Sequence, residues 1–436
     1  MPFTEANSSI NNKPILSEGS TVLTVGPFSC PEPTNGHGGN GMNPPSPEST
    51  RHYPEALEKW WKERVEESDV HTLENLHRNA SVLSDHFTVK RNKGFPDYFK
   101  KPGHLLAYGI YFHPQSWVRT RFPLLEVIEH RGWMPDENED IHILDIGSGP
   151  GSACLSVLQL LHARFPERKV RVTAIDQSPH ALDTLRHCHT DLNHLWPKSS
   201  VRIQSKNLRH RSTLFYGGRD RFDLVVLSFS LNEFTTSSTP EEVVGLIQAS
   251  CRKLLKKHGL LLIIEPALKE TSENLRSLAD SLVVDGAVHN WGPYLHAGPC
   301  PLQQTNKFWS HEVRSWHPPE SMQYLNRRMQ RRIHELKFSY VAMSPTPAPL
   351  APKTAEHFRL VSPMSRMKGH FLMSGVAGDG LAHTYELMFR NLDSEQKRTL
   401  RKIERGDILQ VKNLEQFGDR LRIPSFGDIV QHYHVS

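Results

Sequence analysis

Residues 143–153 read ILDIGSGPGSA. An apolar run ends at three glycines in five positions, Gly147, Gly149 and Gly151, and small residues follow. Glycine adopts backbone conformations that other residues avoid and lets a ligand approach the main chain closely. A strand, a glycine turn and a helix in this order are typical of a ligand cradle at the carboxyl end of a sheet strand. Glycine turns also serve plain strand-to-helix connections, so this pattern alone leaves both interpretations open.

The chain around this turn alternates short apolar runs with longer helical patterns. The runs begin at Ile141 and read IHILDIG, KVRVTAID, VRIQSKN, FDLVVLSFS and GLLLIIE. Continuous apolar strands separated by helix-length segments indicate a parallel sheet covered by helices on both faces. We therefore predict an α/β fold with a doubly wound, mostly parallel, Rossmann-like sheet. KFSYVAM (337–343) and HFRLVSPM (357–364) are later strand candidates for the edge of that sheet.

Composition shifts divide the 436 residues into four predicted parts. Residues 1–52 are rich in Pro, Gly, Ser and Asn, which predicts a disordered arm. Residues 53–136 carry amphipathic helical patterns and are expected to form an N-terminal helical subdomain. The sheet domain is expected at 137–364, with an insertion or lid at 286–336 that is dense in His, Trp and Pro. Residues 365–436 indicate a small β-rich module that includes a short basic helix or loop.

A carboxylate at the end of the second apolar run narrows the choice of ligand. The run RVTAID ends at Asp176, where a carboxylate can accept hydrogen bonds from both hydroxyls of a ribose. Dinucleotide folds prefer G-x-G-x-x-G, whereas Gly151 follows Gly149 by two residues here. The D-x-G-x-G-x-G turn with an Asp on the next strand resembles the class I S-adenosylmethionine-dependent methyltransferases over residues 140–270. NAD binding is the alternative.

This resemblance implies S-adenosyl-L-methionine as the cofactor and a role for each matching residue. The three glycines would lie under its methionine and ribose, Asp145 near its amino acid portion, and Asp176 against its ribose hydroxyls. IQSKNLRH follows the third strand without an acid, so Asn207 is a weak candidate for the adenine contact. The expected cofactor-binding set is Asp145, Gly147, Ser148, Gly149, Gly151, Asp176, Gln177, Asn207 and Ser228.

The fourth strand ends FDLVVLSFSLNEF, and residues just past it face the ligand because open parallel sheets bind ligands at their carboxyl ends. Ser230, Asn232 and Glu233 are therefore the candidate catalytic residues. Glu233 is either a general base or a cap of the following helix. Methyl transfer depends largely on holding the nucleophile in line with the sulfonium, so a strong base is not obligatory.

The segment 286–340 carries a second resemblance. The order LNEF, GPYLHAGPCPL, FWSH and ELKFSYVAM is similar to the methyltransferase-like family of mitochondrial small-subunit ribosome assembly factors and their bacterial relatives. That likeness extends over most of residues 75–415. It implies cysteines in these stretches that hold an iron–sulfur cluster.

This chain departs from the family at those cysteines. Tyr294 stands at the first position, Trp309-Ser310-His311 replaces W-C-H, and only Cys300 remains. A four-iron cluster needs about four thiolates, so we predict no iron–sulfur cluster here. His296, Cys300, His311 and His317 match no standard zinc spacing either, and we predict no metal.

The charge of the chain indicates whether a nucleic acid could be its partner. Lys and Arg number 52 against 47 Asp and Glu, a mildly basic balance that is weak evidence for nucleic acid by itself. Several basic clusters include aromatic residues, which suits single-stranded RNA; the clusters lie at 90–95, 99–104, 117–122, 209–221, 326–332 and 397–405.

We therefore predict a methyltransferase that acts on or assembles small-subunit ribosomal RNA. The alternatives are a methyltransferase for a small molecule or peptide and a non-catalytic ribosome assembly factor. No apolar run approaches the ~20 residues that span a bilayer, so we expect no membrane partner. Scattered cysteines and the lack of a secretory signal predict a cytoplasmic protein.

Overall fold

The computed structural model describes residues 50–436, apart from 69, 89–96, 137–138, 208–219, 236–237, 305–307 and 436. The predicted arm at 1–52 and the basic clusters at 90–95 and 209–221 lie wholly or mostly outside these described residues. In the described part, no helix is both long enough and apolar enough to cross a bilayer.

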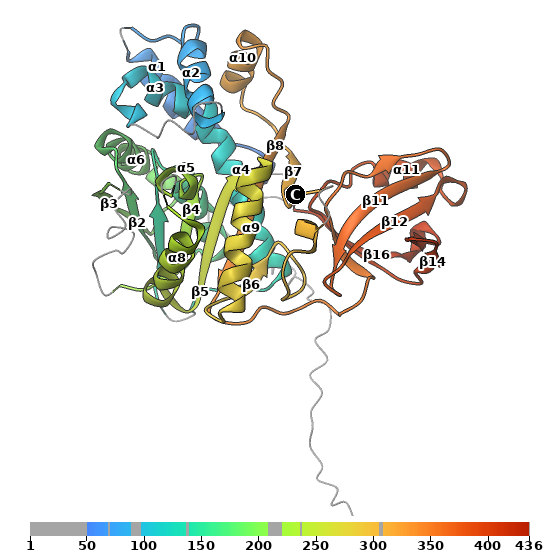
Figure 1. The fold of residues 1–436 in the computed structure, drawn as a ribbon. Helices are drawn as coiled ribbons and strands as arrows, with labels where there is room; N and C mark the ends of the chain where they lie inside the picture. The colour runs from blue at the N-terminus through green and yellow to red at the C-terminus, as the bar shows by residue number, and fades with distance from the viewer. Residues whose placement is uncertain are drawn as a thin grey trace, which may run out of the picture. The chain divides into compact units, whose positions relative to one another are not determined.

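The first sheet confirms the α/β prediction. Within the described ranges it has eight strands in the order β3-β2-β1-β4-β5-β8-β6, with β7 paired to β8. Strands β1 to β5 run parallel, and β8 joins β5 antiparallel (Figure 1). The five predicted apolar runs form β1 to β5, and KFSYVAM lies in β8. The bounds are β1 Ile141–Ile146, β2 Val170–Asp176, β3 Ser199–Ser205, β4 Phe222–Ser228, β5 Leu255–Pro266, β6 His289–Gly292, β7 Glu312–Ser315 and β8 Glu335–Ser344.

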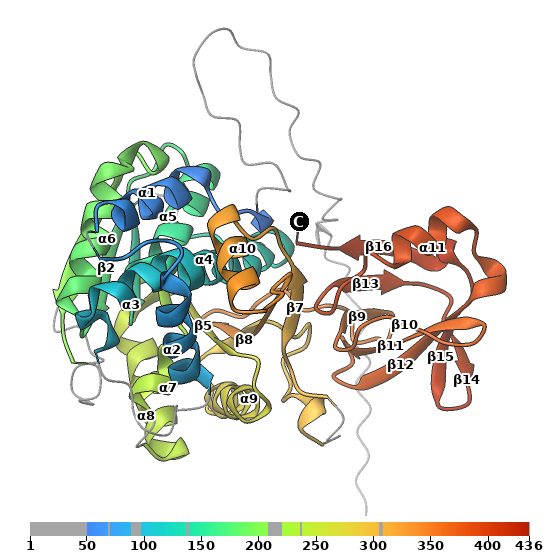
Figure 2. The same cartoon turned by 90° about the horizontal axis from the view of Figure 1, so that it is seen from above.

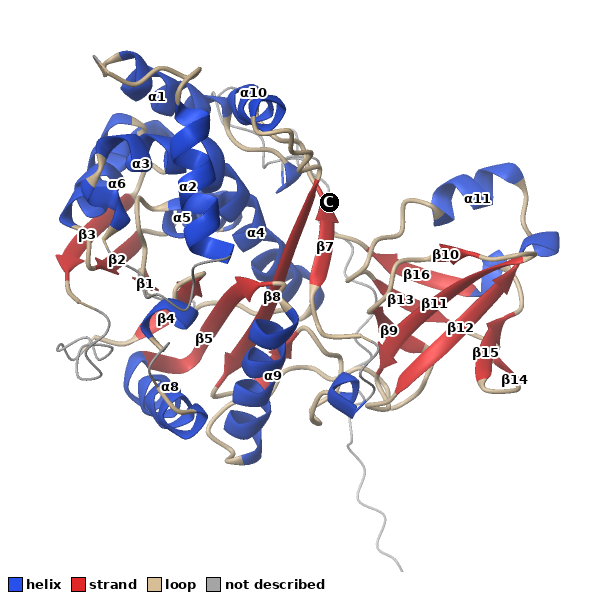
Figure 3. Cartoon of the chain, turned by 45° about the horizontal axis from the view of Figure 1, so that its top comes forward, coloured by secondary structure: helices blue, strands red, loops and turns tan. Residues whose placement is uncertain are grey.

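Helices cover both faces of this sheet, as a doubly wound fold requires. Successive strand residues point to opposite faces, so Ile143 belongs to one apolar core and Leu144 to the other. The core of Ile143 includes α4, α5 and α6, whereas the core of Leu144 includes α8 and α9; Figure 3 shows α5 and α9 on opposite sides of the strands. The bounds are α4 His113–Leu125, α5 Ser152–Arg164, α6 Pro179–Asp191, α7 Leu231–Phe234, α8 Pro240–Leu254 and α9 Lys269–Val284.

The segment before the sheet is helical. It contains α1 (Glu55–Glu66), α2 (Leu76–Thr88) and α3 (Pro102–Ala107), and a π-helical turn at Tyr108–Phe112 joins α3 to α4. Helix α10 (Glu320–Arg328), from the predicted insertion, lies beside α2 (Figure 2). Arg331, just after α10, donates a hydrogen bond to the Ser84 hydroxyl of α2 at 2.8 Å. The insertion is thereby tied to the N-terminal helices.

A second sheet holds the C-terminal strands. Its order in the described residues is β14-β15-β12-β11-β9-β13-β16, and β10 pairs with β11. The prediction that HFRLVSPM forms an edge of the first sheet is wrong: β9 pairs with β11 and β13 of the second sheet. A short apolar strand carries no signal for the sheet it joins, and here Phe358 and Leu360 enter the second core. The bounds are β9 His357–Leu360, β10 Ser365–Arg366, β11 His370–Ala377, β12 Ala382–Met388, β13 Ile408–Val411, β14 Glu415–Phe417, β15 Arg420–Ile423, β16 Ile429–Tyr433 and α11 Ser394–Leu400.

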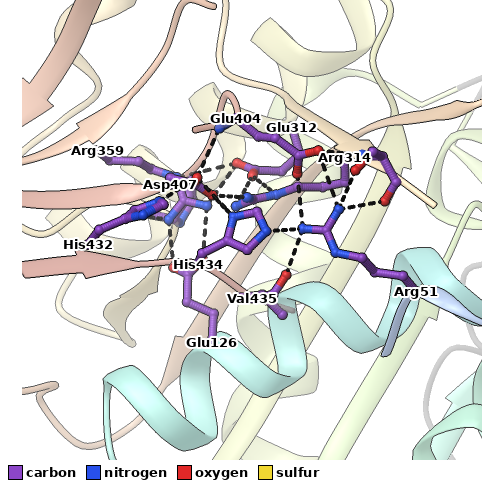
Figure 4. Close-up of polar contacts among 12 residues, drawn as sticks. Arg51, Glu126, Glu312, Arg314, Arg359, Glu404, Asp407, His432, His434 and Val435 are labelled. Atoms are coloured by element: carbon purple, nitrogen blue, oxygen red, sulfur yellow. Dashed lines mark hydrogen bonds and ion pairs between the residues drawn. The ribbon is translucent and has the colours of Figure 1, made fainter. Parts of the chain in front are cut away.

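A buried ion network joins residues of the two sheets (Figure 4). Arg359 of β9 donates to Glu126 Oε1 at 2.6 Å and to Glu312 Oε1 at 2.9 Å. Arg314 pairs with the other oxygen of Glu312 at 2.9 Å and with Asp407, just before β13. The five side chains are each at most 5% exposed. We call Glu126, Glu312, Arg314, Arg359 and Asp407 the ion network.

Candidate functional site

A cavity of about 280 Å³ opens where the carboxyl ends of the parallel strands meet the N-terminal helices. Eight of the predicted site residues line it: Gly147, Gly149, Asp176, Gln177, Ser228, Ser230, Asn232 and Glu233. Four others, Asp145, Ser148, Gly151 and Asn207, are not among its lining residues. Sequence reasoning therefore located one wall of the cavity. The roles proposed for these residues stay predictions.

The glycine turn has the backbone that only glycine adopts readily. Gly147, Gly149 and Gly151 have φ of +75°, +52° and +93°, in the left-handed region. A Cβ on Gly147 would overlap the side chain of Ser230, and one on Gly151 would overlap Leu185. The amides of Gly147 and Ser148 donate to the carbonyl of Ile175, at 2.8 and 3.0 Å, which ties the turn to β2. The turn is therefore held open toward the cavity.

Asp176 ends β2 and bridges two loops. Its carboxylate accepts hydrogen bonds from the amide of Gly149 at 2.8 Å and from the amide of Ser178 at 2.9 Å. Burial raises the pKa of Asp176 to about 6, although both backbone hydrogen bonds act in the opposite direction. A carboxylate so placed can hold the glycine turn and accept a ligand hydroxyl from the cavity side.

Three buried side chains near the turn carry polar atoms without partners. Both carboxylate oxygens of Asp145, the Ser148 hydroxyl and the Ser228 hydroxyl have no hydrogen-bond partner among the described residues. Burial, helped by repulsion from Asp176, raises the pKa of Asp145 to about 7. Native proteins seldom leave buried polar atoms unpaired, because each costs about 1–3 kcal/mol. Of the three residues only Ser228 lines the cavity, and its hydroxyl is available there to a polar ligand.

The residues after β4 are more constrained than the sequence indicated. The Ser230 hydroxyl donates to the carbonyl of Ile146 at 2.7 Å, which packs the end of β4 against the glycine turn. The Asn232 side-chain amide donates to the buried carboxylate of Glu265, at the end of β5. Glu233 lies in α7 and lines the cavity. Ser230 is thus committed to the backbone, whereas Asn232 and Glu233 face the space where an acceptor would enter.

Asn207, the weak candidate for the adenine contact, follows β3. Its side chain is exposed, and it does not line the cavity. The residues that follow, 208–219, lie outside the described part of the chain.

Sequence reasoning missed the opposite wall of the cavity, which is aromatic. The π-helical turn contributes Tyr108, Tyr111 and Phe112, and π-helical turns are frequent at functional sites. Phe87 contacts two rings of this wall edge-on, Tyr98 at 5.3 Å and Phe112 at 5.1 Å between ring centroids. The density of aromatic residues in LAYGIYF was the available signal, but helix-buried aromatics give the same pattern.

The basic cluster at 117–122 is mostly buried and does not form an exposed surface. Trp117, Val118, Arg121 and Phe122 are buried, because α4 lies between the sheet and the N-terminal helices. Arg119, on the same helix, lines the cavity. The prediction that this cluster forms an exposed RNA contact is therefore wrong. By contrast, Lys100 and Lys101 of the cluster at 99–104 and Arg327 and Arg328 of the cluster at 326–332 are exposed.

Tyr294 and Cys300, which stand at the positions of the family's cysteines, are packed against each other. The Tyr294 hydroxyl lies 2.9 Å from the Cys300 thiol, and the Arg276 guanidinium lies 5.0 Å above the Tyr294 ring. The His296 ring stacks on the Tyr294 ring, with 5.4 Å between the ring centroids. One thiol cannot supply the ligands of an iron–sulfur cluster, so the residues present do not fit that group.

One group of side chains in the described ranges is close enough to share a metal ion: Asp407, His432 and His434. His432 Nε2 and His434 Nδ1 lie 2.8 and 2.9 Å from the Asp407 carboxylate. Arg314 also pairs with Asp407, and Arg51 contacts His434 Nε2. A cation would sit beside two guanidinium groups, so the geometry favours a hydrogen-bonded network over a metal centre.

Comparisons with known proteins place the chain in a family. The profile of the family described as "Mitochondrial small ribosomal subunit Rsm22" matches residues 104–410. No curated protein matches the chain.

Similar solved structures are distant. The magnesium protoporphyrin IX methyltransferase of Synechocystis, solved with bound S-adenosylmethionine, is 9% identical, with a TM-score of 0.31 over 62% of this chain and 97% of that one. A SAM-dependent methyltransferase from Aquifex aeolicus is 16% identical, with a TM-score of 0.28 over 40% of this chain and 82% of that one.

Proposed function

Because the chain belongs to the Rsm22 family of the small ribosomal subunit, we propose that it is an S-adenosyl-L-methionine-dependent methyltransferase that acts on or assembles small-subunit ribosomal RNA. One observation carries the enzymatic part of the proposal. The open glycine turn, the ribose-side carboxylate of Asp176 and the unpartnered atoms of Asp145 and Ser148 occur together at the carboxyl end of β1 and β2.

The residues present fit this cofactor. An added Cβ on Gly149 would meet only the Phe99 ring, at 3.6 Å, so the backbone of this cavity-lining glycine is open to a ligand. The buried Asp145 carboxylate is suited to a nearby ammonium group. Gly147 and Gly149 would underlie the methionine and ribose, and Asp176 would accept the ribose hydroxyls. Asp145 does not line the cavity, so it would act on the cofactor through its charge.

S-adenosylmethionine supplies an electrophilic methyl group on a sulfonium. The chain's part is to hold an acceptor atom in line with that group and to exclude water. Asn232 and Glu233 are the polar groups nearest the expected acceptor position, and Glu265 orients the Asn232 amide. Glu233 is placed to accept a proton from an amine or hydroxyl acceptor.

Binding calorimetry tests the cofactor. The protein should bind S-adenosylmethionine and S-adenosylhomocysteine, and Gly149→Arg should abolish both, since a long side chain at φ of +52° would enter the cavity. Tight binding of NAD without either of these nucleosides would overturn the proposal.

Transfer of labelled methyl groups tests the acceptor. We expect label in small-subunit ribosomal RNA with the wild type and none with Gly149→Arg. Label in extracted metabolites or peptides alone would favour the small-molecule methyltransferase. Cofactor binding with RNA binding and without transfer would favour a non-catalytic assembly factor. The cytoplasmic location stays a prediction, and the family description names the mitochondrion.

A further inference from the structure

We propose that Arg119 binds the methyl acceptor, and that this acceptor is an RNA base with a carbonyl oxygen: cytosine, uracil or guanine, not adenine. The inference rests on the proposed methyltransferase function and deepens it by naming the acceptor class and the residue that selects it.

Arg119 is held in one orientation by its neighbours in the cavity wall. Its Nη2 donates to Gln115 Oε1 at 3.1 Å, and Gln115 Nε2 donates in turn to the carbonyl of Tyr111 at 2.7 Å. The guanidinium lies 5.2 Å from the centroid of the Phe229 ring. Both Arg119 and Phe229 line the cavity, so the guanidinium is held at the cavity wall by a hydrogen bond and by a cation–π contact.

The Arg119 cation has no acidic partner in the part of the chain that the structure describes. No ion pair joins it to a carboxylate there, and its Nε is buried without a hydrogen-bond partner. Burial lowers the pKa of Arg119 to about 10, so the group is still a cation at neutral pH. A desolvated cation without an acidic partner is costly, so an oxygen of the ligand is its expected partner.

The backbone conformation of Phe229 is a second, independent observation that points to a functional role for this wall of the cavity. It follows β4 directly and has φ of +59°, a conformation that is strained for a bulky residue. Its amide donates to the carbonyl of Ile264 at 2.7 Å, which holds the strained backbone against β5. The ring that carries Arg119 is therefore fixed beside Ser230, Asn232 and Glu233, where the acceptor must sit.

The rest of the cavity suits a planar base attached to a phosphate chain. The aromatic wall offers ring faces and edges on which a base can stack. Arg331 and the exposed Lys337 line the same cavity and can pair with phosphates. An arginine fork donates readily to the carbonyl oxygens of cytosine, uracil and guanine, whereas adenine has no such oxygen.

Nucleotide titration tests the acceptor class directly. The protein is first saturated with S-adenosylhomocysteine, which blocks its adenosine site, and is then titrated with CMP, UMP, GMP and AMP. At least one of CMP, UMP and GMP should bind tenfold or more tightly than AMP. Equal binding of all four, preference for AMP, or no binding of any would overturn the inference.

Substitution on α4 tests the residue. Arg119→Met should weaken the preferred nucleotide by roughly 10- to 100-fold, because hydrogen bonds to charged groups are lost. Arg119→Lys should recover only part of the affinity, because an ammonium cannot donate as a fork. Arg121→Met is the matched control: Arg121 is buried on the same helix, donates to Gln159 Oε1 at 3.0 Å and does not line the cavity.

With labelled RNA as substrate, Arg119→Met should raise KM more than it lowers kcat, whereas Arg121→Met should change neither selectively. Equal effects of the two substitutions would overturn the role of Arg119. Calorimetry with S-adenosylhomocysteine separates the two proposals. If the wild type fails to bind it, the proposed function fails. If Arg119→Met binds it normally and also binds the nucleotides normally, only the present inference fails.

Discussion

Two buried polar regions of this molecule differ in how their charges are satisfied. In the ion network, each of the three carboxylates contacts at least one guanidinium. At the cofactor edge, which we define as Asp145, Ser148, Asp176 and Ser228, three of the four side chains carry atoms without any partner among the described residues. Complete pairing is typical of structural polar clusters, and incomplete pairing of sites that await a ligand.

Removing one guanidinium from the ion network should have the largest effect on stability. In Arg359→Met, Glu126 and Glu312 stay buried and lose their shared partner, which should lower the free energy of unfolding by about 3–5 kcal/mol. Denaturant unfolding measures this change. Arg398→Met, which removes an exposed pair with Glu395, is the control and should change little. A loss below about 1 kcal/mol for Arg359→Met would contradict a tight network.

Adding a methyl group at the glycine turn should chiefly affect ligand binding. Gly147→Ala places a Cβ against Ser230 at φ of +75°, so S-adenosylmethionine affinity should fall at least about tenfold, with about 1–3 kcal/mol of stability lost. Gly132→Ala is the matched control, because Gly132 has φ of +70° and nothing within 4 Å of its added Cβ. It should show similar backbone strain with unchanged affinity. Equal affinities in both variants would remove the turn from the binding site.

Neutralising Asp145 should stabilise the ligand-free protein at alkaline pH. Its pKa is raised to about 7 by burial, so the folded state holds the proton more tightly than the unfolded state. Wild-type stability should therefore fall as pH rises from about 4 to about 7. Asp145→Asn removes this term and should gain about 1–3 kcal/mol at pH 8, with almost no difference near pH 4. Thermal melts across pH, with and without S-adenosylmethionine, measure the effect; added cofactor should reverse the order.

At Asp407 the stability of the protein should depend on pH in the opposite direction. Arg314 and the two histidines hold the pKa of Asp407 below its usual value despite burial. Its contribution to stability is present above about pH 4 and is lost as pH falls further. Asp407→Asn should therefore destabilise the protein at neutral pH. Identical pH profiles for the two Asn variants would show that the two regions do not differ electrostatically.

The smallest effect on stability is expected for a substitution of Tyr294. Tyr294→Phe removes the hydroxyl beside the Cys300 thiol and should cost about 0.5–1.5 kcal/mol by denaturant unfolding. The same preparations should contain no stoichiometric iron by metal analysis. Iron bound at four atoms per chain would overturn the prediction that this protein lacks a cluster.

Local pattern predicted the sheet well and the cavity only in part. The strands β1, β2, β4 and β5 were recognisable as short runs rich in apolar residues, and β3 by its alternation of Val201 and Ile203 with polar residues. The glycine turn was recognisable because it ends the first run. Eight predicted residues line the cavity because the carboxyl ends of parallel strands meet at one edge. The aromatic wall was missed because Phe87, Tyr98 and Tyr108 reach that edge from elements far from the turn in the sequence.

Tertiary packing also reversed two local predictions. The strand at 357–360 joined the second sheet because Phe358 and Leu360 pack into the C-terminal core, a choice that four residues cannot encode. The arginines of 117–122 turned inward because α4 packs between the sheet and the N-terminal helices. One of them, Arg119, became a cavity cation, and the other, Arg121, became a buried structural cation.

The parallel sheet, the glycine turn and the position of Asp176 could be predicted from the sequence, because each leaves a local pattern: apolar runs, closely spaced glycines, and an acid at the end of a run. Only the tertiary structure decided which buried charges are paired and which are left for a ligand. Pairing depends on distances between residues such as Glu126 and Arg359, 233 positions apart, and no local pattern records that approach.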